Sequence, residues 1–315
     1  MNQHDIAALL ALMRVEGAGN TAGRRALSLS QLLDCSIAEI IAADARTLLP
    51  RLPSGTFDAV ISAAARIEND DLTLASKHVA RMLDAGTHVY AFTDEGYPDL
   101  LSRYLVDAAP ALVWCAGNLE LLNAHGGGVV GTRDPSRVGF EIAMDCARWF
   151  ANEGITVVSG GADGVDSAAH RAAIESNGST IIVLPQGMRT YSFPAYVREA
   201  LECHRCALIS QFDPEMSWQT HAAVTRNATI AALSKIVCVI EPKRMGGSIR
   251  TAKHAFAQGK KVFYHCARGA ESVAPLLRQS GGSDLLTNDH LLDSDALHMA
   301  WGVESADTPS QADLL

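Results

Sequence analysis

The sequence predicts an α/β fold: a parallel β-sheet covered by helices on both faces and preceded by a small all-α domain. Short apolar, β-branched runs alternate with amphipathic helical segments from residue 88 to residue 264, and repeated β–α units of this kind build parallel sheets. Small-residue and glycine-rich turns follow several of these runs. Residues 6–49 show only helical periodicity, which predicts that the sheet begins later in the chain.

The first 85 residues are expected to form the all-α domain. Two helical segments flank a glycine-containing turn at residues 17–20, and a longer helix is expected over residues 58–84. A glycine turn between two short helices is compatible with a hairpin that binds the DNA backbone, and also with a helical packing module. The packing module is the commoner of the two arrangements.

The core, residues 86–292, is expected to carry the sheet. The predicted strands are 88–92, 111–115, a run starting at 129, 155–158, 180–184, 207–210, 236–240 and 261–264. The predicted helices are 99–104, 141–153, 166–177, 195–202, 222–233 and 248–258. Ligands of parallel sheets bind where strands end in loops, so the loops that begin at Gly131, Ser159, Pro185 and Glu241 are expected to line one rim. Residues 293–315 are expected to form an acidic, flexible tail.

Composition narrows the possible functions. The chain is 48% hydrophobic and 19% charged, as is usual for a soluble globular protein, and its formal net charge is -9. Any nucleic-acid site must therefore be a local basic patch. Seven cysteines, an odd number, fit a reducing compartment better than a disulfide framework. No apolar run approaches membrane-spanning length and no signal segment is evident, so a cytoplasmic protein without a membrane partner is expected.

The most informative stretch is the glycine-rich turn at residues 159–164, between an apolar run and a helical segment. Its glycines, Gly160, Gly161 and Gly164, permit positive φ and close backbone approach. Asp166 or Ser167 is expected to cap the following helix, whose first N–H groups would then face a bound phosphate. The same turn is also compatible with a plain tight connection that binds nothing.

Two arginines and a second helix start extend this candidate anion site. Arg133 follows a predicted strand end, and its planar guanidinium suits a phosphate. Arg226, followed by Asn227, is a second candidate, although each arginine is also compatible with a structural ion pair. Gly247 and Ser248 precede a helix and offer N–H groups and a hydroxyl. These features predict a phosphate-bearing ligand without distinguishing a nucleotide from a strand.

Metal and catalytic sites are not indicated. Residues Cys203–Cys206 (CHRC) have a zinc-like spacing, but no second Cys or His pair stands at a matching distance. Ser159, Asp166 and His170 include the residue types of a catalytic triad, yet such residues are plentiful in any chain of this length. We therefore expect no metal, no cofactor and no catalytic residue.

Several segments resemble the DprA/Smf family of DNA-processing proteins. Residues 130–133 (VGTR) are similar to the family's VGSR, and residues 158–170 (VSGGADGVDSAAH) to its SGxAxGID-xxAH. Residues 246–252 (GGSIRTA) resemble its SGSLxTA. The other matching segments are residues 97–101, 117–119 and 226–234. The likeness runs from about residue 8 to residue 290.

The resemblance implies an extended Rossmann-like core that binds single-stranded DNA, usually as a homodimer. It also implies a non-enzymatic role in DNA uptake or recombination, in which the protein loads a RecA-type recombinase. By position, Arg133 matches an arginine that contacts DNA phosphate, and Ser159, Gly160 and Gly164 match the glycine-rich loop. The chain resembles a divergent member without the C-terminal winged helix that many members carry.

Some positions depart from the family pattern. Asp163 stands where the loop usually has Lys or Arg, and Ala228 where an arginine usually follows the asparagine. Arg189 is expected to restore one positive charge, and Tyr191 or Phe193 to stack on bases. The expected phosphate-binding residues are Gly131, Thr132, Arg133, Ser159, Gly160, Gly161, Gly164, Arg189, Arg226, Asn227, Gly247 and Ser248.

The departures leave a second hypothesis open. A nucleotide-binding sensor or defence-associated module of the same superfamily would bind a small phosphorylated ligand, with Asp163 accepting a ribose hydroxyl or excluding polynucleotide. A phosphoribohydrolase is disfavoured, because residues 246–253 lack the glutamate that such enzymes carry in the equivalent loop.

Overall fold

The computed structural model describes residues 1–43, 57–267 and 273–302. Within these residues, nine strands form one sheet in the order β1-β2-β6-β5-β4-β3-β7-β8-β9, which confirms the predicted α/β class. The strands are β1 His88–Ala91, β2 Leu112–Gly117, β3 Gly126–Gly131, β4 Val157–Ser159, β5 Thr180–Val183, β6 Cys206–Ser210, β7 Ser234–Ile240, β8 Lys261–His265 and β9 Ser283–Asp284. Only β2 departs from the predicted parallel arrangement, since it pairs antiparallel with both β1 and β6. The chain turns back beside β1 and so reverses β2.

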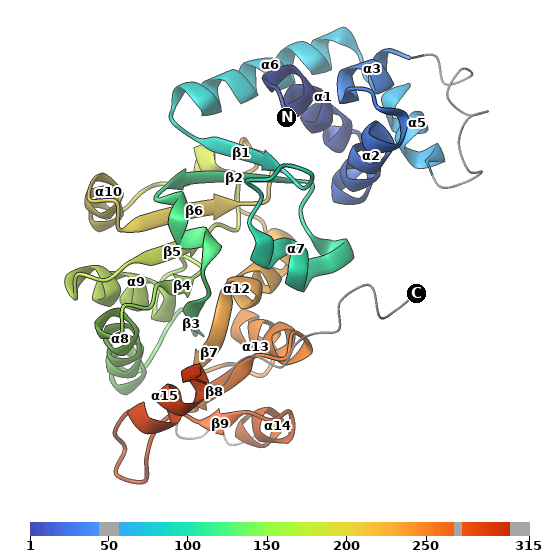
Figure 1. Cartoon of the computed structure of the whole chain (residues 1–315). Helices are drawn as coiled ribbons and strands as arrows, with labels where there is room; N and C mark the ends of the chain where they lie inside the picture. The colour runs from blue at the N-terminus through green and yellow to red at the C-terminus, as the bar shows by residue number, and fades with distance from the viewer. Residues whose placement is uncertain (44–56, 268–272, 303–315) are drawn as a thin grey trace.

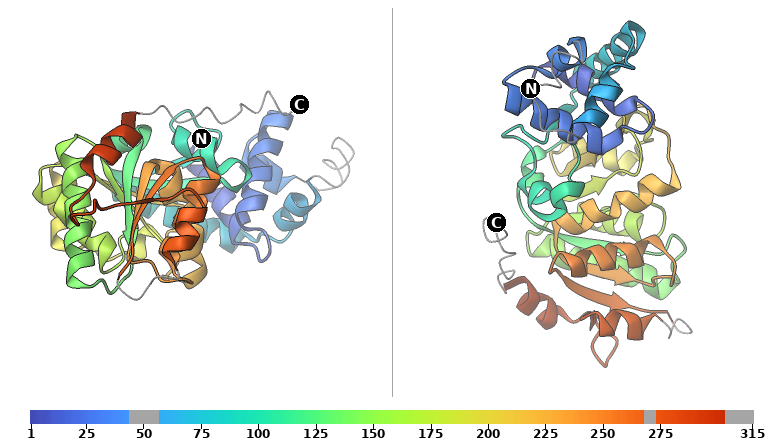
Figure 2. Two further views of the ribbon diagram at one scale, coloured as in Figure 1. Left: turned by 90° about the horizontal axis from the view of Figure 1, so that it is seen from below. Right: turned by 90° about the vertical axis from the view of Figure 1, so that its right-hand side faces the viewer.

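Helices cover both faces of the sheet (Figures 1 and 2). One face carries α8 Arg137–Asn152, α9 Val165–Glu175, α10 Ala195–Glu202 and α15 Ser294–Gly302. The other carries α7 Asp99–Leu105, α12 Asn227–Leu233, α13 Gly247–Ala257 and α14 Ala274–Gln279. α11 Thr220–Thr225 directly precedes α12, and short 3-10 helices occupy Val106–Ala108, Leu119–Asn123 and Met188–Thr190. In the described parts of the chain, none of the helices has the length and apolarity needed to span a bilayer.

A group of helices near the N-terminus, here called the helical region, lies at the β1 end of the sheet (Figure 1). It comprises α1 Gln3–Arg14, α2 Gly19–Leu33, α3 Ile37–Ala42, α5 Asp58–Ala64 and α6 Asn69–Asp84. Its apolar side chains, such as Leu9 and Leu12, belong to the same buried cluster as Leu112 and Trp114 of β2. The helical region and the sheet therefore share one continuous hydrophobic core.

Two predicted helical stretches are each divided in the structure. The helix expected over 58–84 stops at Ala64 and restarts at Asn69, because Glu68 and Asp71 form a reciprocal capping box that begins α6. The helix expected over 222–233 is divided at Arg226 into α11 and α12. Sequence periodicity alone does not detect such breaks, since the apolar spacing continues across them.

Glycines 126–128 lie inside β3, whereas the sequence placed them before the strand. A Cβ on Gly127 would come within 2.3 Å of the Phe150 ring, and one on Gly126 within 2.4 Å of the Thr156 carbonyl oxygen. These glycines therefore let α8 and the neighbouring strand β4 approach the β3 backbone closely.

The predicted flexible tail is wrong for residues 294–302, which form α15. Leu297 is fully buried there, and the Trp301 ring lies 6.3 Å from the ring of Phe150. Lys235 of β7 donates a hydrogen bond to the Trp301 carbonyl oxygen. Apolar side chains on one helix face thus hold this segment on the sheet, while residues 303–315 lie outside the described residues.

Candidate functional site

A groove lies at the carboxyl ends of the central strands, where a parallel sheet places its ligands. A cavity of about 410 Å³ is lined by the turn after β3, by Trp218 before α11, and by the start of α13. A second cavity of about 270 Å³ is lined partly by Asp163 and Tyr191. Arg133, Trp218 and Arg226 line both cavities, so we treat the two as one groove.

The turn after β3 presents Arg133 to the groove. Gly131 ends the strand where a Cβ would come within 2.4 Å of the Ile240 carbonyl oxygen. Thr132 is buried, and its carbonyl oxygen accepts a hydrogen bond from the Val165 N–H at 3.2 Å. The Arg133 side chain is exposed, with its guanidinium carbon 5.2 Å from the centre of the Trp218 ring. This cation–π contact leaves the guanidinium donors available at the groove surface.

The glycine-rich turn is closed by a carboxylate of the chain itself. One oxygen of Asp166 accepts hydrogen bonds from the Gly160 N–H at 3.2 Å and the Ala162 N–H at 3.4 Å. Asp166 therefore does not cap α9, and it occupies the place that the sequence assigned to a phosphate. Burial raises the pKa of Asp166, whereas Arg226 and these N–H groups oppose that rise.

The start of α9 is satisfied internally as well. α9 begins after Gly164, whose φ is +80° and whose Cβ would meet the backbone of Arg133. Ser167 donates to the Gly164 carbonyl oxygen and so does not cap the helix either. Ser159 is fully buried, and its hydroxyl donates to the Val129 carbonyl oxygen at 2.6 Å. Ser159 is therefore a structural residue and does not face a ligand.

Arg226 is the most unusual side chain of the groove. It is only 4% exposed, and among the described residues its Nε and Nη1 atoms have no hydrogen-bond partner. Burial lowers its pKa to about 10, with Asp166 opposing the shift and Arg133 adding to it. A Cβ on Gly160 would come within 1.5 Å of Nη1, so glycine at 160 makes room for the guanidinium. Buried donors without partners are rare and mark places where a ligand can bind.

The start of α13 forms the opposite wall. Its N-cap residue, Gly246, makes no side-chain capping bond, so the first N–H groups of the helix are available to a ligand. Asn227 donates to the Gly247 carbonyl oxygen at 3.2 Å and thereby holds the helix start in position. Ser248 lines the larger cavity next to Gly247.

The lining residues that were not predicted from the sequence include Trp218, Lys243 and Arg250. Lys243 and Arg250 lie close in sequence to the glycine motif at residues 246–248. The motif therefore identified this part of the chain, although not these two side chains. Trp218 belongs to no motif, and only the fold brings its ring beside Arg133. At 45% exposed, Trp218 offers an accessible aromatic surface in the groove.

Arg189 does not lie where the sequence predicted it. Its Nε is 2.6 Å from Glu215 Oε1, and it lines neither cavity of the groove. Tyr191 lines the second cavity, while Phe193 packs on the core with its ring perpendicular to that of Tyr191. Of the two predicted stacking residues, only Tyr191 therefore borders the groove.

Ser159, Asp166 and His170 do not form a catalytic triad in the structure. His170 is fully buried, and its Nδ1 lies 2.7 Å from the Thr180 hydroxyl. Burial lowers the pKa of His170 to about 3, with Arg226 contributing, so the ring is neutral near neutral pH. Among the residues that the structure describes, no group of three or more His, Cys, Asp or Glu side chains is placed to hold a metal ion.

The profile of DNA recombination-mediator protein A matches residues 88–288. This chain belongs to that family. The DNA processing protein DprA of Bacillus subtilis is 30% identical over 221 residues, which cover 68% of this chain and 72% of the relative. The corresponding protein of Streptococcus pneumoniae is 34% identical over 176 residues, covering 55% and 61%.

Two solved structures share the fold. The structure of DprA from S. pneumoniae superposes with a TM-score of 0.67 at 23% identity, covering 92% of this chain and 96% of that one. The structure of DprA from Helicobacter pylori superposes with a TM-score of 0.55 at 21% identity, covering 68% of this chain and 96% of that one.

The putative DprA of Mycobacterium tuberculosis is 34% identical over 160 residues, so this chain matches 40% of that relative's length.

Proposed function

We propose that this protein binds single-stranded DNA in the groove and acts in DNA processing without catalysing a reaction. The observation that carries the proposal is Arg226, a buried guanidinium at the groove with two donor atoms that no described residue satisfies. A buried charge of this kind is costly unless an anion pairs with it. A DNA phosphate bound in the groove supplies negative charge beside this guanidinium.

The groove has the two components that non-specific strand binding needs. Arg133 and Arg226 provide positive charge, and the start of α13 adds backbone donors. Trp218 offers an exposed ring against which a base can stack. The two adjoining cavities make room for more than one nucleotide. DprA from H. pylori has a single-stranded DNA binding mode, which supports the same ligand here.

The net charge of -9 is compatible with this proposal, because the positive charge is local. Arg133, Arg226, Lys243 and Arg250 all line the larger cavity, whereas Asp166, the one carboxylate among its described lining residues, is engaged by the turn. Arginine and lysine bind anions but rarely transfer protons near neutral pH, which supports a binding role over an enzymatic one. Asp163 borders only the second cavity, so its negative charge does not line the larger, more basic one.

Family membership supports a finer role: a cytoplasmic homodimer that coats strands and loads a RecA-type recombinase during DNA uptake or recombination. The alternative, a sensor of a small phosphorylated ligand, draws support from the size of the larger cavity, about 410 Å³, which suits one nucleotide. Asp163 would then accept a hydrogen bond from a ribose hydroxyl.

A titration of labelled oligo-dT at low and high salt, with AMP as competitor, tests the proposal. A protein that contacts several phosphates of a strand loses affinity for it steeply as the salt concentration rises, by a logarithmic slope of about 0.7 per contact. We expect such a slope and no displacement by AMP. Undetectable strand binding, together with a higher melting temperature in AMP, would refute strand binding and establish the sensor.

A further inference from the structure

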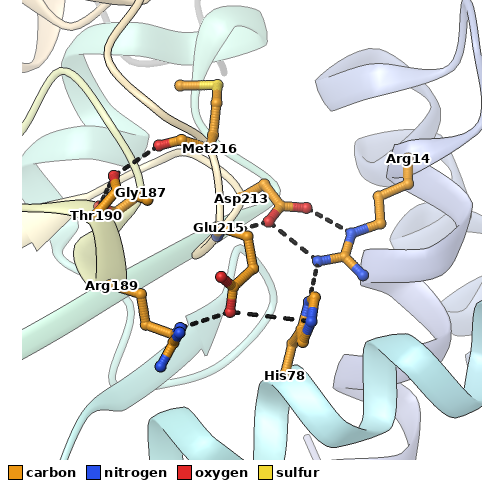
Figure 3. Close-up of polar contacts among 8 residues, drawn as sticks. All are labelled: Arg14, His78, Gly187, Arg189, Thr190, Asp213, Glu215 and Met216. Atoms are coloured by element: carbon orange, nitrogen blue, oxygen red, sulfur yellow. Dashed lines mark hydrogen bonds and ion pairs between the residues drawn. The ribbon is translucent and has the colours of Figure 1, made fainter.

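The Trp218 side of the groove is carried by a loop, residues 211–219, that is tied to the helical region (Figure 3). Arg14, at the end of α1, contacts both carboxylate oxygens of Asp213, through Nε at 2.5 Å and Nη2 at 3.0 Å. The same Nη2 lies 2.7 Å from Nδ1 of His78 on α6. Bidentate contacts of this type fix orientation as well as distance.

Asp213 in turn organises the loop. Its carboxylate accepts the Glu215 N–H at 2.9 Å, and its carbonyl oxygen accepts the Met216 N–H at 2.9 Å. The Met216 carbonyl oxygen then accepts the Gly187 N–H and the Thr190 hydroxyl, each at 2.8 Å. These contacts fix the loop as far as Met216, two residues before Trp218.

A second set of contacts joins the same elements. Glu215 Oε1 is 2.6 Å from Arg189 Nε and 3.9 Å from His78 Nε2. Although burial alone would raise the pKa of Asp213, hydrogen bonds from Arg14 and the Glu215 N–H outweigh it, so the pKa lies below its usual value. Asp213 is therefore charged near neutral pH, and its interaction with Arg14 is that of a full ion pair.

We propose that Arg14 is a positioning residue for the groove: by holding Asp213 it fixes the loop that carries Trp218. The helical region would thereby set the affinity of a groove that it does not line, since all described lining residues lie at or after Val130. The inference rests on the proposed function for its effect on DNA affinity, but the placement of Trp218 can be measured without DNA.

Arg14 is not needed merely to dock the helical region. Asn20 donates to the Ala109 carbonyl oxygen and accepts the Ala111 N–H, which joins α2 to the segment before β2. The Arg24 guanidinium lies over the Phe92 ring, and the shared hydrophobic core adds to both contacts. These anchors remain when Arg14 is changed, so its substitution should loosen the loop without releasing the helices.

The test examines three variants: Arg14→Gln, Asp213→Asn and the double variant that carries both changes. The control is Arg25→Gln, which changes an exposed arginine on α2. Acrylamide quenching of Trp218 is obtained by subtracting the signal of matched Trp218→Phe variants, and oligo-dT affinity is measured alongside. We expect both single variants to quench more strongly and to bind about five- to tenfold more weakly. The double variant should bind no more weakly than the weaker-binding single variant, because both changes break the same contact. Arg25→Gln should match the wild type in both measurements.

Three outcomes separate the possibilities. If Arg14→Gln matches Arg25→Gln in both measurements while Trp218→Phe weakens binding, the positioning role is wrong and the groove assignment stands. If the wild type binds no strand, yet Arg14→Gln still exposes Trp218 to quencher, the positioning role stands and the proposed function fails. If Arg14→Gln lowers the melting temperature, the charge-exchanged pair Arg14→Asp with Asp213→Arg decides: restored quenching supports positioning, and unrestored quenching refutes it.

Discussion

Two helix starts line the groove, and they differ in whether residues of the chain pair with their N–H groups. The N–H groups before α9 are paired with Asp166, and the Val165 N–H is paired with Thr132. The start of α13 has no side-chain cap and lines the larger cavity. A glycine-rich turn before a helix therefore does not by itself make an anion site, because a residue of the chain can take the anion's place.

The comparison assigns different roles to the two sides. The α9 side is a structural support that uses Asp166 to hold the turn and to neutralise Arg226 in part. The α13 side, with Arg133 and the buried Arg226, is the side on which we propose that a ligand binds. Changes on the α9 side should therefore act mainly on stability, and changes on the α13 side mainly on binding.

Asp166→Ala should have the largest effect. It leaves the Gly160 and Ala162 N–H groups unpaired and Arg226 as a buried cation without a counter-ion, which costs about 3–5 kcal/mol of unfolding free energy. Chemical denaturation measures this loss of unfolding free energy. Asp163→Ala, an exposed change in the same turn, is the control and should stay within about 0.5 kcal/mol. Equal losses in both variants would contradict a supporting role for Asp166.

Arg226→Gln should weaken oligo-dT binding by about a hundredfold, since charge-assisted hydrogen bonds to a phosphate contribute about 1.5–3 kcal/mol each. The matched control is Arg148→Gln, which removes an exposed arginine of α8 that lines neither cavity. Its effect should be under about twofold. If the two variants lose affinity equally, the groove does not hold the strand.

Acid should destabilise the protein through His170 on α9. The folded-state pKa of His170 is about 3, and the unfolded value is about 6.5. Between these values the unfolded chain binds the proton and the folded chain does not, so stability falls as the pH falls, by about 1.4 kcal/mol per pH unit. Denaturation at pH 7 and pH 5 measures the loss. A His170→Gln variant should show a flatter dependence, and an unchanged slope would contradict this assignment.

Gly247→Pro should give the smallest effect and the sharpest test of the open helix start. Proline is tolerated at the first helical position and removes only that N–H, and Gly246 already has the extended backbone that precedes proline (φ -80°, ψ 167°). We expect stability within about 0.5 kcal/mol of wild type and binding about fivefold weaker. Gly247→Ala keeps the N–H and should bind normally; equal binding by both variants would show that this N–H does not contact the strand.

How far the sequence predicts the site depends on the range of the interactions involved. Arg133 and the residues at the start of α13 were located correctly relative to the sheet, because strand ends and helix starts follow from local periodicity. Arg189 was misplaced, since its position depends on an ion pair with Glu215, a residue of another loop. Trp218 was missed, because it belongs to no motif and only the fold brings its ring beside Arg133 and the 185–191 loop.

The sequence by itself determined the alternation of strands and helices, and with it the α/β class and the edge of the sheet at which ligands bind. These properties follow from residue periodicity and from the short connections between neighbouring elements. The tertiary structure alone decided the antiparallel placement of β2, the docking of α15 and the use of Asp166 as an internal anion. Each of these depends on contacts between residues distant in the chain, and local pattern carries no information about which distant partner satisfies a buried charge or an apolar face.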